Sequence, residues 1–319
     1  MEDLNGKYNL KEYKIKVDKN KWKINWQDTY EKSLLLFITG KCNLNCKNCF
    51  SSSTRNSVEM TLEQIKSILD ANKEFKKLDL MGGEPLLHKN IKGIIQEIRK
   101  RNQQPSLYTN GIKLNELPED IMPIRACVSF HEIEADNPSR KPLKPIMHNL
   151  SEFVKKGNKL KLVFLMDQYN VGRALEIVNF VDKNMCFVNK LTIGLMRYEN
   201  DYWNDNHEGV LPFDMYADNI QKIINEYEGR LNLDIFLKGV LNFEGDPGDL
   251  PNRVNRFKCV FQDLTYSDCL YNACDLKHPK LSKDYKLPES LCNCKHTGKK
   301  KCLADKVRLT KVKEEEKYE

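Results

Sequence analysis

The chain has 319 residues, of which 40% are hydrophobic and 30% charged, a composition that fits one large globular domain or a domain with an appendage and excludes a disordered chain. Its longest apolar run, Leu34–Ile38, is too short to span a bilayer, and the N-terminus lacks a signal-peptide stretch, so we expect a cytoplasmic protein without a membrane partner. The formal net charge of +7 comes from interspersed charges and does not indicate nucleic-acid binding.

Residues 1–31 are expected to form a small hairpin ahead of the main domain. Polar and apolar residues alternate in the segments 13–17 and 22–26, and the turn-forming sequence Asp18-Lys19-Asn20 lies between them. An extension of this size is too small to bury an independent core.

Residues 32–230 alternate short buried runs with amphipathic segments, which is the pattern of an α/β domain. The first helix opens with a capping box that runs from Thr61 to Gln64. Strands that alternate with helices favour parallel pairing, in an open sheet or a partial barrel, and such sheets carry their chemistry where the strands end. The expected helices lie near 62–69, 91–98, 171–181 and 216–227, and the six expected strands at 34–38, 77–81, 106–109, 126–130, 161–166 and 191–196.

Eleven cysteines in a chain without an export signal indicate metal binding or catalysis, because a reducing cytosol opposes disulfides. Cys42, Cys46 and Cys49 follow the first strand, whereas Cys127 and Cys186 stand alone. Two separate metal sites are therefore expected, the second formed by a later group that comprises Cys259, Cys269, Cys274, Cys292, Cys294 and Cys302.

The spacing Cys42-x3-Cys46-x2-Cys49 places three thiolates within eight residues. Three thiolates can hold three irons of one 4Fe–4S cubane, and because no fourth cysteine lies nearby, one iron would stay open to another ligand. Bacterial ferredoxins use a different run with a further cysteine, which argues against simple electron transfer. A zinc site with three thiolate ligands is the alternative, although structural zinc sites normally close with paired CxxC knuckles.

This motif resembles the CxxxCxxC loop of the radical S-adenosylmethionine (radical SAM) superfamily, which follows the first strand of a partial (β/α)6 barrel. The sequence Gly82-Gly83-Glu84-Pro85 is similar to the GGEP element of the family, which receives the methionine ammonium of the cofactor. The segment Tyr108–Gly111 is similar to the end of the family's third strand, and Val128–Phe130 to a fourth-strand segment whose serine faces the cofactor. The resemblance covers the central domain and implies as cofactor-binding residues Gly82, Gly83, Glu84, Pro85, Asn110 and Ser129.

The resemblance also implies the chemistry of the family. S-adenosylmethionine (SAM) chelates the open iron, the reduced cluster passes an electron to the sulfonium, and cleavage yields methionine and a 5′-deoxyadenosyl radical that abstracts a substrate hydrogen. An external donor of the flavodoxin or ferredoxin type would supply the electron. One position departs from the family pattern: before the third cysteine, where the family frequently has an aromatic residue packed on adenine, this chain has Asn48. Phe50, directly after Cys49, is the candidate adenine contact in its place.

The later cysteines resemble a SPASM/twitch module, which we expect at 231–310 ahead of a charged tail at 311–319. The run Cys259-x9-Cys269-x4-Cys274 matches the opening of that module, except that Cys269 stands in place of a glycine.

The remaining spacing departs from the module's pattern, and six thiols suffice for one auxiliary 4Fe–4S cluster with two left over. A structural zinc knuckle that includes His296 is the alternative. The expected auxiliary ligands, in order of preference, are Cys259 and Cys274, then Cys294 and Cys302, with Cys269 and Cys292 ambiguous.

Alternation on the fourth strand places Cys127, Ser129 and His131 on one face, which would line the inside of the barrel. Cys127 is a candidate hydrogen-atom donor to a substrate radical, and an ordinary buried thiol is the alternative. His131 would contact the substrate or a loop backbone. Arg197 ends the sixth strand and is a candidate partner for a cofactor or substrate carboxylate, with a surface ion pair as the alternative.

In this superfamily an auxiliary cluster often accompanies enzymes that act on peptides. We therefore expect maturation of a ribosomally synthesised peptide by crosslinking, epimerisation or oxidation, an inference that rests on analogy. A small-molecule dehydrogenase or synthase with a twitch module is the first alternative. A zinc-binding, basic nucleic-acid-binding protein is the second, disfavoured because aromatic residues are not interleaved with Lys299-Lys300-Lys301.

Overall fold

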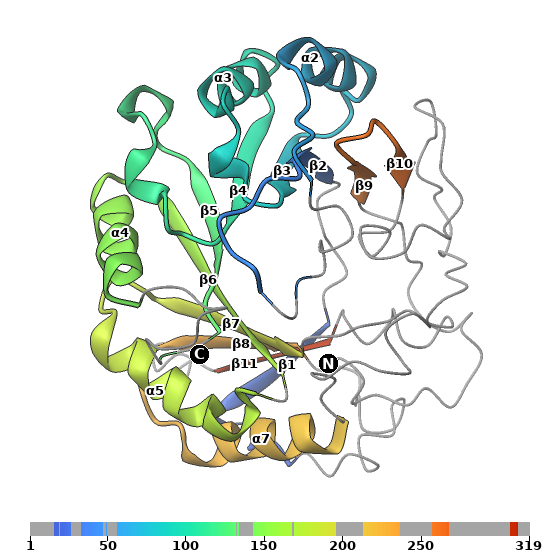
Figure 1. The fold of residues 1–319 in the computed structure, drawn as a ribbon. Coiled ribbons are helices and arrows are strands. Elements are labelled where there is room, and N and C mark those ends of the chain that lie inside the picture. The colour runs from blue at the N-terminus through green and yellow to red at the C-terminus, as the bar shows by residue number, and fades with distance from the viewer. Residues whose placement is uncertain are drawn as a thin grey trace, which may run out of the picture.

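In the computed structural model of the chain, the strands of the described residues join in one eleven-stranded sheet, in the order β1-β11-β8-β7-β6-β5-β4-β3-β2-β9-β10 (Figure 1). The structure describes residues 16–18, 20–26, 33–46, 49, 56–131, 133, 143–167, 169–195, 213–236, 257–267 and 307–311. The strands are β1 (Trp22–Trp26), β2 (Ser33–Thr39), β3 (Lys77–Gly82), β4 (Gln104–Thr109), β5 (Arg125–Ser129), β6 (Lys159–Met166), β7 (Lys190–Leu195), β8 (Asn232–Phe236), β9 (Phe257–Val260), β10 (Tyr266–Ser267) and β11 (Val307–Lys311).

Strands β2 to β8 run parallel, and each pairs with the next along the chain. The sheet is curved, and its helices lie on the outer side (Figure 1). This arrangement confirms the predicted α/β partial barrel and all six predicted strands.

None of the helices in the described part of the chain is both long and apolar enough to cross a membrane. They are α2 (Leu62–Ala71), α3 (Ile91–Lys100), α4 (Leu143–Lys155), α5 (Ala174–Asn184) and α7 (Phe213–Glu226), with short 3-10 helices η3 (Pro85–Leu87), η4 (Leu114–Glu116), η5 (Glu119–Ile121) and η6 (Val171–Arg173).

The side chains of β2 alternate between the two faces of the sheet, and both faces are buried. Leu34, Leu36 and Ile38 are fully buried in the main core, on the side covered by the helices. Leu35 and Phe37 point to the inner face of the barrel and pack in a second apolar cluster with Met81, Cys259 and Phe261. Burial on both faces explains why this strand reads as a continuous apolar run.

The helix α2 begins at the predicted capping box. Thr61 Oγ1 accepts a hydrogen bond from Gln64 N at 3.2 Å, and Gln64 Oε1 accepts one from Thr61 N at 2.7 Å. Two backbone N–H groups that the first turn leaves without helical partners are thereby satisfied.

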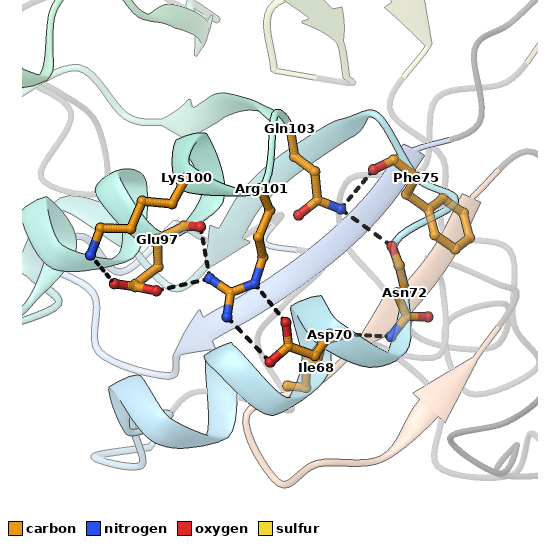
Figure 2. Close-up of polar contacts among 8 residues, drawn as sticks. All are labelled: Ile68, Asp70, Asn72, Phe75, Glu97, Lys100, Arg101 and Gln103. Atoms are coloured by element: carbon orange, nitrogen blue, oxygen red, sulfur yellow. Dashed lines mark hydrogen bonds and ion pairs between the residues drawn. The ribbon is translucent and has the colours of Figure 1, made fainter.

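An ion-pair network ties α2 to α3 on the outer surface (Figure 2). Arg101 donates from Nε to Asp70 Oδ1 and from Nη1 to Glu97 Oε2, both at 2.8 Å. Close to this network, the buried Gln103 donates from Nε2 to Phe75 O at 2.8 Å. These bonds fix the turn between α2 and β3, and with it the start of the strand whose far end carries the candidate site.

The sheet extends further at both edges than the sequence indicated, and at the β2 edge it is β9 that pairs with β2, in parallel. β8 continues the parallel barrel past the expected boundary at residue 230, because it pairs with β7. β1 pairs antiparallel with β11, and β11 pairs with β8, so both strands belong to the barrel sheet. Leu309 of β11 is fully buried, and Lys311, expected in a charged tail, ends that strand. Residues 1–15 of the expected hairpin lie outside the described residues.

Candidate active site

The cysteine loop, which carries Cys42, Cys46 and Cys49, leaves the C-terminal end of β2, and residues 58–60 lie alongside that strand end again. Residues 38–40 and 58–60 pair in antiparallel fashion, and Met60 N donates to Ile38 O at 2.9 Å. This pairing closes the loop at its base. The three predicted cluster ligands therefore lie on one short loop that is anchored at the edge where the parallel strands end.

Cys42, Cys46 and Cys49 are all half-buried on this loop. Leu44 N donates a hydrogen bond to Cys42 Sγ at 3.4 Å. Among the described residues, no three Cys, His, Asp or Glu side chains lie close enough together to hold a metal ion. Three soft thiolate donors suit an iron–sulfur cluster by their chemistry.

Two glycines let the end of β3 touch the cysteine loop. Gly82 has a φ of +137°, and a Cβ at this position would lie 2.2 Å from Thr39 O. A Cβ on Gly83 would lie 2.1 Å from Lys41 O, whereas the Gly83 N–H donates to Thr39 O at 2.8 Å. The space is filled by backbone, so only glycine permits this approach. We call residues 82–85 the glycine loop.

Glu84 of the glycine loop joins the ends of β3 and β4. Its carboxylate is buried and accepts hydrogen bonds from Thr109 Oγ1 and from Asn110 N, both at 2.7 Å. It also accepts a bond from Leu86 N at 3.1 Å and so caps η3. The acid that the family resemblance assigns to the cofactor ammonium thus has a second task, which is to hold two strand ends together.

Asn110 connects the end of β4 to the cysteine loop. Its Nδ2 donates to Asn43 Oδ1 at 2.7 Å, and its Oδ1 accepts a bond from Ile112 N at 3.0 Å. Both ends of the side-chain amide are therefore bonded within the protein. Asn43 was not singled out from the sequence, because an asparagine in a loop carries no periodicity and its partner is 67 residues away.

A charged pair and a buried histidine support the two loops. Lys41 Nζ lies 2.8 Å from Glu59 Oε2. Burial acts to raise the pKa of Glu59, but the Lys41 hydrogen bond and the nearby cations lower the pKa overall. His88 Nε2 lies 2.8 Å from Met60 O, and His88 Nδ1 accepts a bond from Asn90 N at 3.1 Å. Burial lowers the pKa of His88, and a neutral ring with its proton on Nε2 fits both contacts.

The inner face of β5 carries Cys127, which is buried, and Ser129, which is half-buried. In the strand register Cys127 lies between Tyr108 of β4 and Lys161 of β6, neither of which was predicted as a site residue. On the outer face of β6 the side chains of residues 162, 164 and 166 are buried, whereas Lys161, Val163 and Leu165 on its inner face are only half-buried. Solvent therefore reaches the inner face at β6, next to Cys127.

His131 Nδ1 accepts a hydrogen bond from Leu165 N at 3.1 Å, so its backbone partner lies in strand β6 and not in the loop that was expected. Cys259, an expected auxiliary ligand, is fully buried on β9 in the apolar cluster with Phe37. Its role as a ligand stays a prediction. The remaining predicted site residues lie outside the described residues, namely Phe50, Arg197, Cys269, Cys274, Cys292, Cys294 and Cys302.

A family model described as the radical SAM superfamily matches residues 36–202, just over half of the chain. The chain belongs to the radical SAM superfamily. The matched region contains the cysteine loop, the glycine loop and the inner face of β5. Membership of this enzyme family implies a 4Fe–4S cluster and SAM as cofactors, and the three thiols that follow β2 fit the cluster by the chemistry of their donors.

Curated relatives of this radical SAM protein include two named as GTP 3′,8-cyclases. The probable GTP 3′,8-cyclase of Methanococcus vannielii is 34% identical over 166 residues, which cover 48% of this chain and 55% of that protein. The GTP 3′,8-cyclase of Clostridium perfringens is 26% identical over 181 residues, which cover 50% of this chain and 56% of that protein. The chain thus spans about half the length of the curated relatives it matches.

Two solved structures share the fold of this radical SAM protein. Streptococcus suis SuiB bound to the precursor peptide SuiA aligns with a TM-score of 0.62 and 14% identity, covering 87% of this chain and 65% of SuiB. Native anSMEcpe with bound AdoMet and the Cp18Cys peptide aligns with a TM-score of 0.58 and 16% identity, covering 76% of this chain and 75% of that one. At such identities the likeness shows the fold alone.

Proposed function

We propose that this radical SAM protein cleaves SAM reductively and that the 5′-deoxyadenosyl radical abstracts a hydrogen atom from a substrate held on the inner face of the barrel. When bound, the cluster supplies the electron and SAM supplies the radical, while an external donor of the flavodoxin or ferredoxin type re-reduces the cluster. The protein's part is to hold both cofactors side by side and to orient the substrate beside them.

The observation that carries this proposal is the contact between the cysteine loop and the glycine loop. Lys41 O occupies the place of a Gly83 side chain and accepts a hydrogen bond from Glu84 N at 2.7 Å. The loop that would bind iron and the loop that would bind the SAM ammonium are therefore in direct backbone contact. The proposed ligands of the three irons are Cys42, Cys46 and Cys49.

Further residues are proposed to complete the site. Asn110 would face SAM through its backbone, because both ends of its side-chain amide are bonded elsewhere. Ser129 is half-buried on the inner face and would face the cofactor. Cys127 lies two residues before it on the same strand face and is the proposed hydrogen-atom donor to a substrate radical. Phe50 and Arg197 remain proposed contacts of adenine and of a carboxylate.

Anaerobic reconstitution with iron and sulfide tests the reaction class. We expect an electron paramagnetic resonance signal that changes when SAM is added, and formation of 5′-deoxyadenosine under strong reductant. Cys46→Ala should lose both, whereas Cys186→Ala should keep both, because Cys186 is an exposed thiol in the turn before β7. A colourless protein that contains zinc, or one that leaves SAM intact, would contradict the proposal.

For the substrate, we propose a residue of a ribosomally synthesised peptide, which would be crosslinked, epimerised or oxidised. Support comes from the shared fold with SuiB bound to its precursor peptide and with anSMEcpe bound to a peptide. The half-buried inner face of β6 offers Lys161 beside two apolar side chains, a surface that would accept an extended polar chain.

A small-molecule substrate is the second candidate, and it would be a purine nucleotide. The relative from Methanococcus vannielii favours it, because 34% identity over 166 residues is closer than the likeness to either peptide-bound structure. SAM cleavage measured with a candidate precursor peptide and, separately, with GTP would distinguish the two. A mass change in the peptide supports the first candidate, and a new nucleotide product in its place supports the second.

We further propose one auxiliary 4Fe–4S cluster in the C-terminal cysteine-rich region. Replacing both Cys259 and Cys274 with alanine should lower the bound iron by one cubane, about four irons, relative to Cys186→Ala. An unchanged iron content would refute the auxiliary cluster while leaving the cluster of the cysteine loop in place.

A further inference from the structure

We propose that Asn43 and Asn110 form a positioning pair that fixes Cys42, the first cluster ligand, against the glycine loop. This inference rests on the proposed function. Asn43 follows Cys42 directly, and its Oδ1 accepts a hydrogen bond from Asn110 Nδ2 at 2.7 Å. The bond joins a loop that leaves β2 to the end of β4, which is not a neighbour of β2 in the sheet.

This hydrogen bond closes a ring of contacts around Cys42. On one side of the cysteine, Lys41 O accepts a hydrogen bond from Glu84 N at 2.7 Å. On the other side, Asn43 is bonded to Asn110, whose own N–H donates to the carboxylate of Glu84 at 2.7 Å. The ring returns to Glu84, so both neighbours of Cys42 are tied to the same residue of the glycine loop.

Asn110 can serve as a fixed point because its surroundings hold it firmly. It is buried, and Ile112 N donates to its Oδ1, which leaves Nδ2 facing Asn43. Thr109, the residue before it, donates to the buried carboxylate of Glu84 at 2.7 Å. Hydrogen bonds to a buried carboxylate are among the stronger ones, and bonds in such a network reinforce one another.

The ring should matter for SAM affinity more than for cluster retention. The proposed role of SAM requires it to reach the open iron and the glycine loop at the same time, so the spacing of Cys42 from Glu84 decides whether both contacts form. Removing the Asn43 side chain leaves all three thiols in place but frees one side of Cys42. It also leaves Asn110 Nδ2 without its partner in a partly buried place.

The test compares Asn43→Ala with Asn43→Asp, which keeps the acceptor oxygen, in the full-length protein. After anaerobic reconstitution, SAM affinity is read from the spectral change on titration, and iron is counted separately. We expect Asn43→Ala to weaken SAM binding by about tenfold and Asn43→Asp by no more than about twofold, since only the first loses the hydrogen bond. Both variants should keep the iron content of the unchanged protein. Asn184→Ala, which removes an exposed amide bonded to Phe180 O, is the matched control.

Two further readouts separate positioning from a general loss of structure. Asn43→Ala combined with Asn110→Ala should be no worse in SAM affinity than Asn110→Ala alone, because the two residues act through one bond. In the cluster-free protein, amide hydrogen exchange should rise in residues 40–46 of Asn43→Ala and stay unchanged in α5.

Three outcomes would overturn the inference while the proposed function stands: normal SAM affinity in Asn43→Ala, additive losses in the double variant, or loss of iron from Asn43→Ala. The last would make Asn43 necessary for holding the cluster rather than for placing it. A failure of the proposed function would be seen in the unchanged protein, as a reconstituted cluster whose signal does not respond to SAM, and would overturn both.

Discussion

Replacing Gly83 with alanine tests the loop contact on which the site depends. The added Cβ would lie 2.1 Å from Lys41 O and 2.8 Å from Gly40 O, both backbone atoms. Ordinary van der Waals contact begins at 3.4 Å, so Lys41 O must withdraw by about 1.3 Å. That shift disrupts the 2.7 Å hydrogen bond from Glu84 N to Lys41 O and displaces Cys42, which follows Lys41 directly.

Two costs contribute to the expected loss of stability. Forcing an extra methyl group against backbone costs roughly 1–3 kcal/mol, and losing one hydrogen bond costs about 1 kcal/mol. We therefore expect Gly83→Ala to lower the free energy of unfolding by about 2–4 kcal/mol. Gly172 offers a matched control, because a Cβ there would meet nothing within 4 Å. Gly172→Ala should be neutral or stabilise the protein by up to about 1 kcal/mol.

Urea unfolding of the cluster-free proteins, followed by circular dichroism, measures the first effect. Titration of the reconstituted proteins with SAM measures the second, since displacement of Cys42 should weaken binding. If Gly83→Ala unfolds at the same urea concentration as Gly172→Ala, the two loops do not approach as closely as the structure shows, and the reasoning fails. Normal SAM affinity in a destabilised Gly83→Ala would refute the link from this contact to the cofactor.

Three other perturbations have equally definite expectations. Glu84→Gln turns one carboxylate oxygen into an amide donor that faces the backbone N–H and Thr109 hydroxyl donors. The free energy of unfolding, measured in urea titrations, should therefore fall by about 2–3 kcal/mol. An unchanged urea midpoint would count against the role of Glu84 in joining the two strand ends. Burial lowers the pKa of His88 from 6.5, so the contribution of the neutral ring to the free energy of unfolding should be fully present above about pH 6.5 and decline as the pH falls below it. In His88→Gln the urea midpoint should depend less on pH over this range. The same pH dependence in both proteins would contradict the assignment. Hydrogen bonds from Lys100 and then Arg101 lower the pKa of Glu97 from 4.5 to about 2, so its stabilising effect should be present above pH 4.5 and disappear toward pH 2. The stability of Glu97→Gln should therefore fall less between pH 4.5 and pH 2 than the stability of the unchanged protein. Identical acid-unfolding curves for the two proteins would exclude this contribution of Glu97.

Much of the barrel could be predicted because its signals are local. The run Leu34–Ile38 is buried on both faces of β2 and therefore reads as unbroken apolar sequence, and the capping box at Thr61 marks a helix start by short-range bonding alone. The glycine loop was found by its resemblance to a family element, and the structure adds the physical reason for Gly82 and Gly83, which is the close approach of the cysteine-loop backbone.

What could not be predicted depends on contacts between distant parts of the sequence. Nothing near residues 22–26 indicates that they pair with 307–311, because alternation in a strand specifies a face and not a partner. The bond between Asn43 and Asn110 is hidden for the same reason, since two polar loop residues become a pair only once β2 and β4 are in place. The double task of Glu84 likewise appears only when two strand ends meet.

The long-range pairing at the outer edge of the sheet has a consequence for how the protein is made. On the ribosome, β8 emerges about 70 residues before β11, and until then its outward edge of backbone donors and acceptors has no partner strand from residues 307–311. At roughly 5–20 residues per second this interval lasts several seconds. Nascent chains in that interval would be exposed to edge-to-edge aggregation at β8, so a chaperone that shields this edge during synthesis should raise the yield of native protein.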